Sequence, residues 1–363
     1  MSRIAFAILF LAPGLLLGKA MATEGAPAAK VYEGVVGSAP IVMSLEGPDD
    51  SFSGNYFYRS QRFDIDLSGE TKKGVIQLEA FITGDKLSLK PDGAGYTGSL
   101  TTAKGKTLPV HLHPVGPEAA RNAPADAGDG ISLYERIRLS GLALKPQKTE
   151  TVAGRDLRWY LEPTSGARLF RIESGYDAPV MEAINKALAR IQWANVSEYF
   201  SCPGMEGGSG LENAEVGKPY LSDAHVSFAI EESWSCAGAA HPDFGMEGHS
   251  FDAKTGKEME LDDLLKFGKA PVPKKDSDAW LDYRSKTFAP GVVALLKRFY
   301  PKEMKAPKGE DDCNYSDAEV WSFPAWRLTE KGVYVGASFA RAMRVCDNPE
   351  WSVIPYSALK ESR

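Results

Sequence analysis

The sequence predicts an α+β protein in two parts: an N-terminal antiparallel β meander or barrel-like domain, and then an α+β domain whose sheet is packed by two helices. Residues 31–115 alternate apolar and polar side chains in short runs separated by turn residues. Apolar residues recur at helical spacing in 177–191 and 277–300. The 363 residues, 43% hydrophobic and 25% charged, are enough for two globular domains.

The first 22 residues have the form of a secretory signal peptide. Arg3 precedes an apolar run over 4–17, and Ala20 and Ala22 supply the small residues that a signal peptidase requires. The run is shorter than the ~20 apolar residues of a membrane-spanning helix, and no later stretch is apolar enough to span. We therefore expect a soluble periplasmic or secreted protein.

Cleavage after Ala22 would make the chain more acidic. It removes Arg3 and Lys19 and no acidic residue, so the formal net charge moves from −6 to −8. An acidic surface argues against nucleic acid and anionic lipid as partners, because both repel negative charge, and it suits a basic protein.

The first domain is predicted to consist of strands throughout. Apolar and polar residues alternate strictly over 63–67, so this strand has two different faces. Glycine, proline and aspartate gather between the runs and mark turns. This spacing is typical of an antiparallel meander that is closed or half-closed. The predicted strands are 31–36, 41–45, 54–58, 63–67, 75–81, 86–89, 95–100 and 107–115.

Residues 116–150 are predicted to connect the two domains. The segment 116–130 is rich in Gly, Pro and Ala and has no periodicity, so it is interpreted as a linker or long loop. Residues 131–144 show strand-like alternation, and the domain to which they belong is left open. The second domain is expected over 151–363.

Two amphipathic helices are predicted in the second domain. Asp177 is a candidate N-cap, and the residues behind it carry an apolar stripe that includes Ile184 and Leu188. The second helix is expected over 277–300, with a break near Pro290 because proline lacks the N–H that a helix interior needs.

All four cysteines lie in the C-terminal half of the chain. Export favours disulfides, and four cysteines allow three pairings. Zinc is the alternative, but no CxxC or CxxH spacing occurs. The preferred pairing is Cys202 with Cys236 and Cys313 with Cys346, each closing a loop of about 33 residues.

Residues 231–265 are predicted to form a hairpin, a turn and a short helix. A strand leads into a loop over 236–245, and a second strand follows over 247–253. Gly256 makes the next turn because glycine tolerates positive φ, and the acidic residues after it cap a short helix.

The run GAAHPDFGMEGHSFDAKTGKEMELDDLL over 238–265 resembles the RsiV-like C-terminal domain, an extracytoplasmic domain of bacterial envelope proteins. Residues 326–335 and 353–359 resemble its closing strands, so the resemblance covers 159–359. It implies binding: in the anti-sigma factor RsiV the domain binds lysozyme, and it also accompanies peptidoglycan deacetylases. This chain has no internal membrane helix and no deacetylase domain, so neither the anti-sigma nor the deacetylase activity is carried over.

The N-terminal domain also resembles a small β module of bacterial envelope proteins. The resemblance rests on Gly54, Tyr56 and Tyr58 and, further on, Tyr96. It concerns architecture only.

The candidate binding residues are Trp234, His241, Asp243 and Phe244. A histidine near a carboxylate could serve as a base or metal ligand, and aromatic rings suit a binding surface. The alternative is that His241 only fixes the loop through hydrogen bonds, because function requires a geometric constellation. His249 is expected in a strand with its ring half buried.

Other candidate sites are weaker. His111 and His113 lie on one face of a strand and could chelate a metal, but no third ligand is near in the sequence. Glu231 and Glu232 are adjacent in a strand and point to opposite faces, so they are not a catalytic dyad. No cofactor and no metal are expected.

These observations favour an exported binding or sensing protein of the cell envelope, without enzymatic activity. Its expected partner is a peptidoglycan fragment or another cell-wall component, or a basic, lysozyme-like protein. The alternative is an envelope hydrolase that uses His241 and Asp243.

Overall fold

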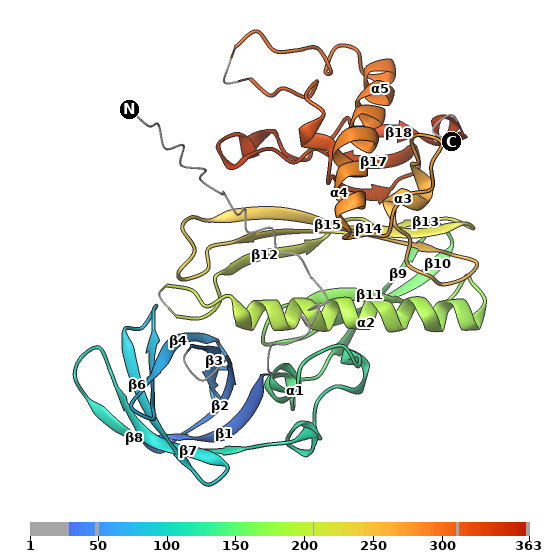
Figure 1. Cartoon of the computed structure of the whole chain (residues 1–363). Coiled ribbons are helices and arrows are strands. Elements are labelled where there is room, and N and C mark those ends of the chain that lie inside the picture. The colour runs from blue at the N-terminus through green and yellow to red at the C-terminus, as the bar shows by residue number, and fades with distance from the viewer. Residues whose placement is uncertain (1–28, 48–50, 206, 310–311, 361–363) are drawn as a thin grey trace, which may run out of the picture.

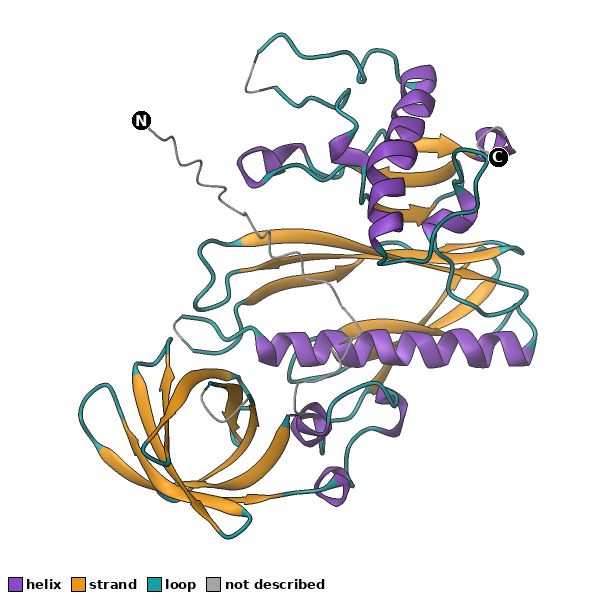
Figure 2. Ribbon diagram, viewed as in Figure 1, coloured by secondary structure: helices purple, strands orange, loops and turns teal. Residues whose placement is uncertain are grey.

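A computed structural model describes residues 29–47, 51–205, 207–309 and 312–360. The predicted signal peptide, residues 1–22, lies outside the described residues. The fold is α+β, with an N-terminal β-barrel followed by three smaller sheets and a long helix (Figure 1, Figure 2). Within the described residues, no helix is long and apolar enough to cross a membrane.

The N-terminal barrel is an eight-stranded antiparallel meander, as the sequence predicts. Each strand pairs with the next, and β1 also pairs with β8, which closes the sheet on itself. The strands are β1 Lys30–Val36, β2 Ala39–Glu46, β3 Phe52–Tyr58, β4 Ile65–Lys72, β5 Val75–Ala80, β6 Asp85–Asp92, β7 Gly95–Thr101 and β8 Thr107–Pro114.

The barrel interior is an apolar core. Ile41, Met43 and Leu45 alternate into it along β2, whereas Val42 on the other face packs outside the barrel. This division follows from the period of two along a strand.

The connection between the domains is packed against both of them. It contains 3-10 turns at Pro117–Ala120 and Ala125–Ala127, which bury Ala120 and Ala127. The indole Nε1 of Trp193 donates to Asp126 over 2.8 Å. The segment 116–130 therefore connects the barrel to the rest of the chain through two short 3-10 turns that pack against its neighbours.

The strand-like interpretation of 131–144 is wrong, because the structure has helix α1 (Leu133–Leu139) there. The hydroxyl of Ser132 accepts from the backbone N–H of Glu135, which caps the first turn. This cap, together with the packing of Tyr134 and Ile137 on the barrel, outweighs the strand preference that the short alternation of apolar and polar residues suggests.

A buried polar network joins α1 to the barrel. Arg138 is fully buried and pairs with Asp64 before β4 and, over 3.3 Å, with Glu135. The hydroxyl of Tyr134 donates to the same Asp64 carboxylate over 2.7 Å. Removing the cation would leave carboxylates buried without their counter-charge, so the network holds the barrel on the rest of the chain.

Helix α2 (Ala178–Ser201) is the centre of the second domain and begins after Asp177, as predicted. One face packs on two sheets, through Ile184 and Leu188, and the other packs toward α1 through Trp193 (Figure 1). The first sheet is β9 Lys145–Val152, β10 Arg155–Leu161 and β11 Arg168–Ile172, and its first strand begins before residue 151, where the second domain was expected to begin. The second is β12 Leu211–Val216, β13 Tyr220–Leu221, β14 His225–Trp234 and β15 Asp243–Asp252.

The last part of the chain covers the other face of the β14–β15 sheet (Figure 2). The second predicted helix is present as one continuous helical run. A π turn at Arg284–Phe288 separates its two α-helical parts, and the break expected near Pro290 does not occur. The elements are α3 Leu261–Leu264, α4 Asp278–Tyr283, α5 Ala289–Phe299, β16 Ala325–Leu328, β17 Gly332–Gly336 and β18 Val353–Pro355.

β16 crosses β15 closely at one glycine. A Cβ on Gly248 would lie 1.7 Å from the carbonyl oxygen of Trp326, so no side chain fits there. Beside this crossing, the backbone N–H of Leu328 donates to the hydroxyl of Ser227 over 2.9 Å. The C-terminal sheet is thus fixed on the hairpin that carries the candidate residues.

Candidate functional site

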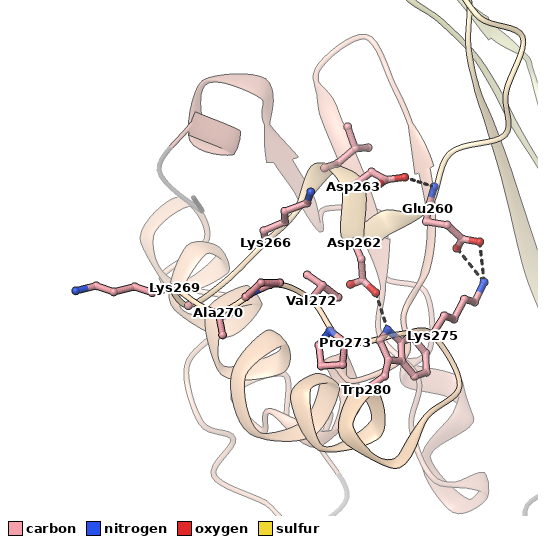
Figure 3. Close-up of a pocket in the computed structure, with 13 residues that line it drawn as sticks. Glu260, Asp262, Asp263, Lys266, Lys269, Ala270, Val272, Pro273, Lys275 and Trp280 are labelled. Carbon is pink, nitrogen blue, oxygen red and sulfur yellow. Dashed lines mark hydrogen bonds and ion pairs between the residues drawn. The ribbon is translucent and has the colours of Figure 1, made fainter.

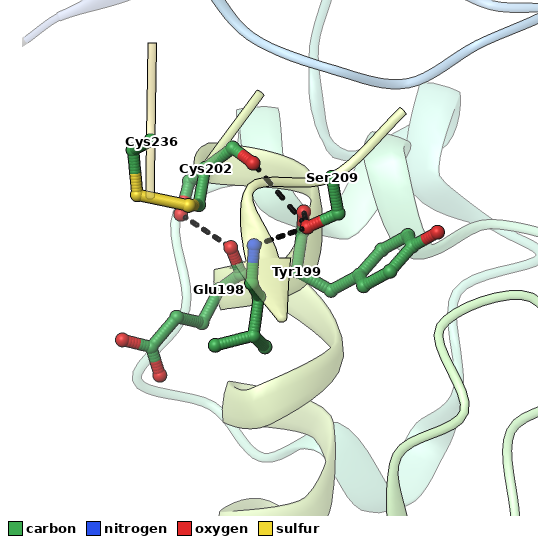
Figure 4. Close-up of a disulfide and its surroundings, with 7 residues drawn as sticks. Glu198, Tyr199, Cys202, Ser209 and Cys236 are labelled. Carbon is green, nitrogen blue, oxygen red and sulfur yellow. Dashed lines mark hydrogen bonds between the residues drawn. A yellow bond between two sulfur atoms is a disulfide. The ribbon is translucent and has the colours of Figure 1, made fainter. Parts of the chain in front are cut away.

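The β14–β15 hairpin is tied at its tip to the end of α2. Cys202, at the C-cap of α2, forms a disulfide with Cys236, two residues after β14 (Figure 4). Backbone hydrogen bonds beside it run from Gly210 to Cys202 and from Ala237 to Pro203, each over 2.6 Å. The predicted pairing is confirmed, and it fixes the position of the hairpin relative to the helix.

The second predicted disulfide, Cys313–Cys346, is also present. Cys346 ends the 3-10 segment Arg341–Cys346, whose arginines face the hairpin. Both disulfides therefore lie beside the elements that frame the candidate site.

Asp243 and Phe244 are the first residues of strand β15, whereas the sequence placed them in a loop. They pair with Trp234 and Ser233 of β14. The hairpin ladder therefore extends closer to the tip than expected, to the pair Trp234 and Asp243.

Asp243 is held by two arginines. Its Oδ2 lies 3.3 Å from Nη1 of Arg341 and 3.2 Å from Nη1 of Arg344. Arg344 also pairs with Asp347 over 3.0 Å and stacks 5.2 Å from the ring centroid of Phe244. The Asp243 carboxylate is thus compensated by charges of the chain itself.

His241 is exposed and is not brought to Asp243. Among the described residues it has no hydrogen-bond or ion-pair partner, and the Asp243 carboxylate is directed to the arginines. The two residues therefore do not form the histidine–carboxylate pair that a base would need.

A groove of about 500 Å³ lies where α2, the hairpin and the segment before β16 meet. Trp234, Phe244 and Phe323 bring aromatic rings to it, and residues Phe244 and Phe323 are 41% and 51% exposed. Predicted residues Trp234, Asp243 and Phe244 therefore share one groove, which His241 does not line.

Three glutamates give this groove its charge. Glu198 comes from the last turns of α2, Glu232 from β14 and Glu247 from β15, and all three line the groove (Figure 4 shows Glu198 beside the disulfide). Burial, and then the charges of Glu198 and Glu247, raise the pKa of Glu232 to about 8. Burial and the charge of Glu247 also raise the pKa of Glu198. The carboxylates in the groove repel one another. A proton retained on at least one of them reduces this repulsion.

His249 lies next to one of these carboxylates, that of Glu247. The residue is 6% exposed, so it is more buried than the sequence suggested. Nδ1 lies 3.1 Å from Oε1 of Glu258, and Nε2 lies 3.7 Å from Oε1 of Glu247 without a hydrogen bond. The imidazole thus lies between the carboxylates of Glu258 and Glu247.

Sequence reasoning missed this cluster. It considered Glu232 only with its neighbour Glu231 and correctly separated the two onto opposite faces of β14. It did not single out Glu198 or Glu247, because they lie on other elements and no spacing motif connects them. The one local signal is that Glu232 extends the buried series Val226, Phe228 and Ile230 on its face of the strand.

A larger hollow near α3 is a weaker candidate for a functional site. It measures about 860 Å³ and is framed by 260–275 and Trp280 (Figure 3). Asp262 already accepts from Trp280 over 2.7 Å and from Arg284 over 2.8 Å, and Glu260 pairs with Lys275. Its carboxylates are therefore committed to structural bonds.

The histidine pair on β8 is not assembled into a metal site. His111 contacts Thr97 over 3.3 Å, and both imidazoles are on the outer face of the barrel. No group of metal-ligating side chains that could hold an ion is present in the part of the chain that the structure describes.

Comparisons with protein-family models, with curated proteins and with solved structures find no match to this chain.

Proposed function

We propose that this chain is an exported binding or sensing protein of the cell envelope, periplasmic or secreted, that recognises a basic, lysozyme-like protein or a cell-wall component. The observation that carries this proposal is the groove in which Glu198, Glu232 and Glu247 lie beside exposed aromatic rings. Carboxylates steer a basic partner toward the groove, and the rings supply contact area at low entropic cost.

Two further facts support a binding role. The chain carries a formal net charge of −6, so its long-range field attracts cationic partners. The resemblance of 159–359 to the RsiV-like domain implies the same class of function. A hydrolase based on His241 and Asp243 is the alternative, and it is less favoured because Asp243 is engaged by Arg341 and Arg344.

The test is binding of the mature chain to lysozyme and to peptidoglycan fragments, measured by calorimetry at low and high salt. We expect lysozyme to bind and its affinity to fall as salt rises. Phe244→Ala should weaken the complex, whereas Leu281→Ala, an apolar side chain of similar exposure on α4, should not.

Turnover of peptidoglycan fragments that His241→Ala abolishes without unfolding would show that the hydrolase alternative is correct. If neither binding nor turnover is observed, the binding proposal and the hydrolase alternative are both wrong.

A further inference from the structure

The pattern Asn-x-Ser, with a residue other than proline in the middle, occurs twice in the chain, at Asn195 and at Asn314. This pattern is the acceptor for N-linked glycans in exported proteins, where the transferring enzyme recognises the amide together with the hydroxyl two residues later. The amide must also lie on the surface, because the enzyme has to reach it. The structure separates the two asparagines by these criteria.

Asn195 is not accessible for this chemistry. It lies within helix α2 and is 9% exposed. Residues two positions apart in a helix do not face each other, so the amide of Asn195 and the hydroxyl of Ser197 cannot be recognised together. In the folded protein this copy of the pattern is therefore closed to an enzyme.

Asn314 lies in a turn in the segment that follows α5 (Figure 1). The described residues between α5 and the 3-10 turn Glu319–Trp321 form no helix or strand. Asn314 and Ser316 are both partly exposed, and the hydroxyl of Ser316 donates to Oδ1 of Asn314 over 2.6 Å. The backbone N–H of Asp317 donates to the carbonyl oxygen of Asn314 over 3.3 Å. The turn thus brings together the two groups that the pattern requires.

Contacts of the neighbouring residues hold this turn on the domain and leave the amide nitrogen free. The hydroxyl of Tyr315 donates to the carbonyl oxygen of Cys346 over 3.0 Å, and its ring packs against other aromatic rings of the C-terminal part. Cys313 is fixed by its disulfide to Cys346. The bond from Ser316 engages the amide oxygen of Asn314, and Nδ2 has no hydrogen-bond partner among the described residues.

We infer that Asn314 is the acceptor of an N-linked glycan, transferred from a lipid-linked oligosaccharide after export. A bond forms between Nδ2 of Asn314 and the anomeric carbon of the first sugar, while the bond from that carbon to the diphosphate of the lipid carrier breaks. The lipid diphosphate leaves with the bonding electrons, and a base of the transferase takes the proton that Nδ2 releases.

The inference depends on the export of the chain and is independent of its binding role. None of the described residues 312–317 lines the groove that holds the glutamates. A glycan on Asn314 and a partner in the groove therefore occupy different parts of the surface.

The experiment incubates the folded, oxidised mature chain with a purified oligosaccharyl transferase and its lipid-linked oligosaccharide. The activity of the enzyme is first verified on an unrelated acceptor peptide. Intact-mass spectrometry should then show a single added glycan per chain, and peptide mapping should place it on Asn314. Asn314→Gln should remove the added mass, and Asn195→Gln, the matched control, should leave it unchanged.

The hydroxyl of Ser316 provides a second, independent readout. Ser316→Ala should lower the rate of transfer at least about tenfold, because it removes the hydrogen bond to the amide. Ser316→Thr keeps the hydroxyl and should restore transfer. Circular dichroism of each variant separates loss of transfer from loss of fold.

A linear peptide of residues 308–320 shows which part of the reasoning is wrong if the folded chain gains no glycan. Modification of the peptide alone would show that the turn does not present Asn314 to the enzyme. Failure of both would show that the sequence itself is not an acceptor. Modification of Asn195 in the folded chain would show that burial and helix geometry do not select between the two asparagines.

Discussion

Glu232 should make the stability of this protein depend on pH between about 4.5 and 8. Its pKa rises from the ordinary 4.5 to about 8 in the folded state. Between these pH values the folded chain keeps a proton that the unfolded chain has released, so the free energy of unfolding falls as pH increases. Glu232→Gln removes the ionisation while keeping the size of the side chain, and it should therefore stabilise the protein at high pH.

The magnitude follows from the pKa and from the position of the side chain. At about 1.36 kcal/mol per pH unit, a pKa near 8 corresponds to at most about 5 kcal/mol. The carboxyl lies in a groove that is open to water, and solvent screening and local relaxation reduce this value. We expect Glu232→Gln to gain about 1 to 2 kcal/mol relative to wild type at about pH 8.5, and almost nothing at about pH 4.5.

Urea unfolding monitored by tryptophan fluorescence measures this difference on the oxidised protein. Both proteins are followed from about pH 4.5 to about pH 8.5. Glu215→Gln should run parallel to wild type over the whole range, because its carboxylate is exposed. If Glu232→Gln also runs parallel to wild type, Glu232 titrates as an ordinary surface carboxylate and the groove does not concentrate negative charge.

Three further perturbations test the framework around the groove. Arg138→Met should lower the free energy of unfolding by about 3 to 5 kcal/mol, because it leaves buried Asp64 without its counter-charge. Urea titration measures this loss, and a value below about 1 kcal/mol would contradict the stabilising role of the buried polar network. Gly248→Ala should separate β16 from β15 and lower the melting temperature, since its Cβ would lie 1.7 Å from Trp326 O, and an unchanged melting temperature would show that the crossing is loose. Trypsin should cut after exposed Lys269 before it cuts in the packed connection 116–130, and mass spectrometry of early fragments would reveal the opposite order.

The strands of the barrel could be predicted because their signal is local. Alternation along β2 and its neighbours depends only on adjacent residues, and the turns between strands carry their own glycine and proline markers. The start of α2 after Asp177 is local in the same way. The local pattern gave the wrong prediction for α1. There a short alternation suggested a strand, whereas the N-cap hydrogen bond between Ser132 and Glu135 favours a helix.

The disulfides were predictable from cysteine number and from the expected export of the chain, whereas the partners of the candidate residues were not. Asp243 and Arg344 are 101 positions apart, and neither residue alone indicates that the other neutralises it. Their contact depends on how the last segment folds back over the hairpin.

Only the tertiary structure brought Glu198, Glu232 and Glu247 into one groove. The rotation of α2 about its axis decides where Glu198 points, and the register of β14 with β15 decides which face Glu232 and Glu247 share. The packing of the whole domain sets both the rotation of α2 and the register of the hairpin. The sequence determined the strands, the long helix and the cysteines that tie the hairpin down, while the raised pKa of Glu232 exists only because folding brings distant carboxylates together away from bulk water.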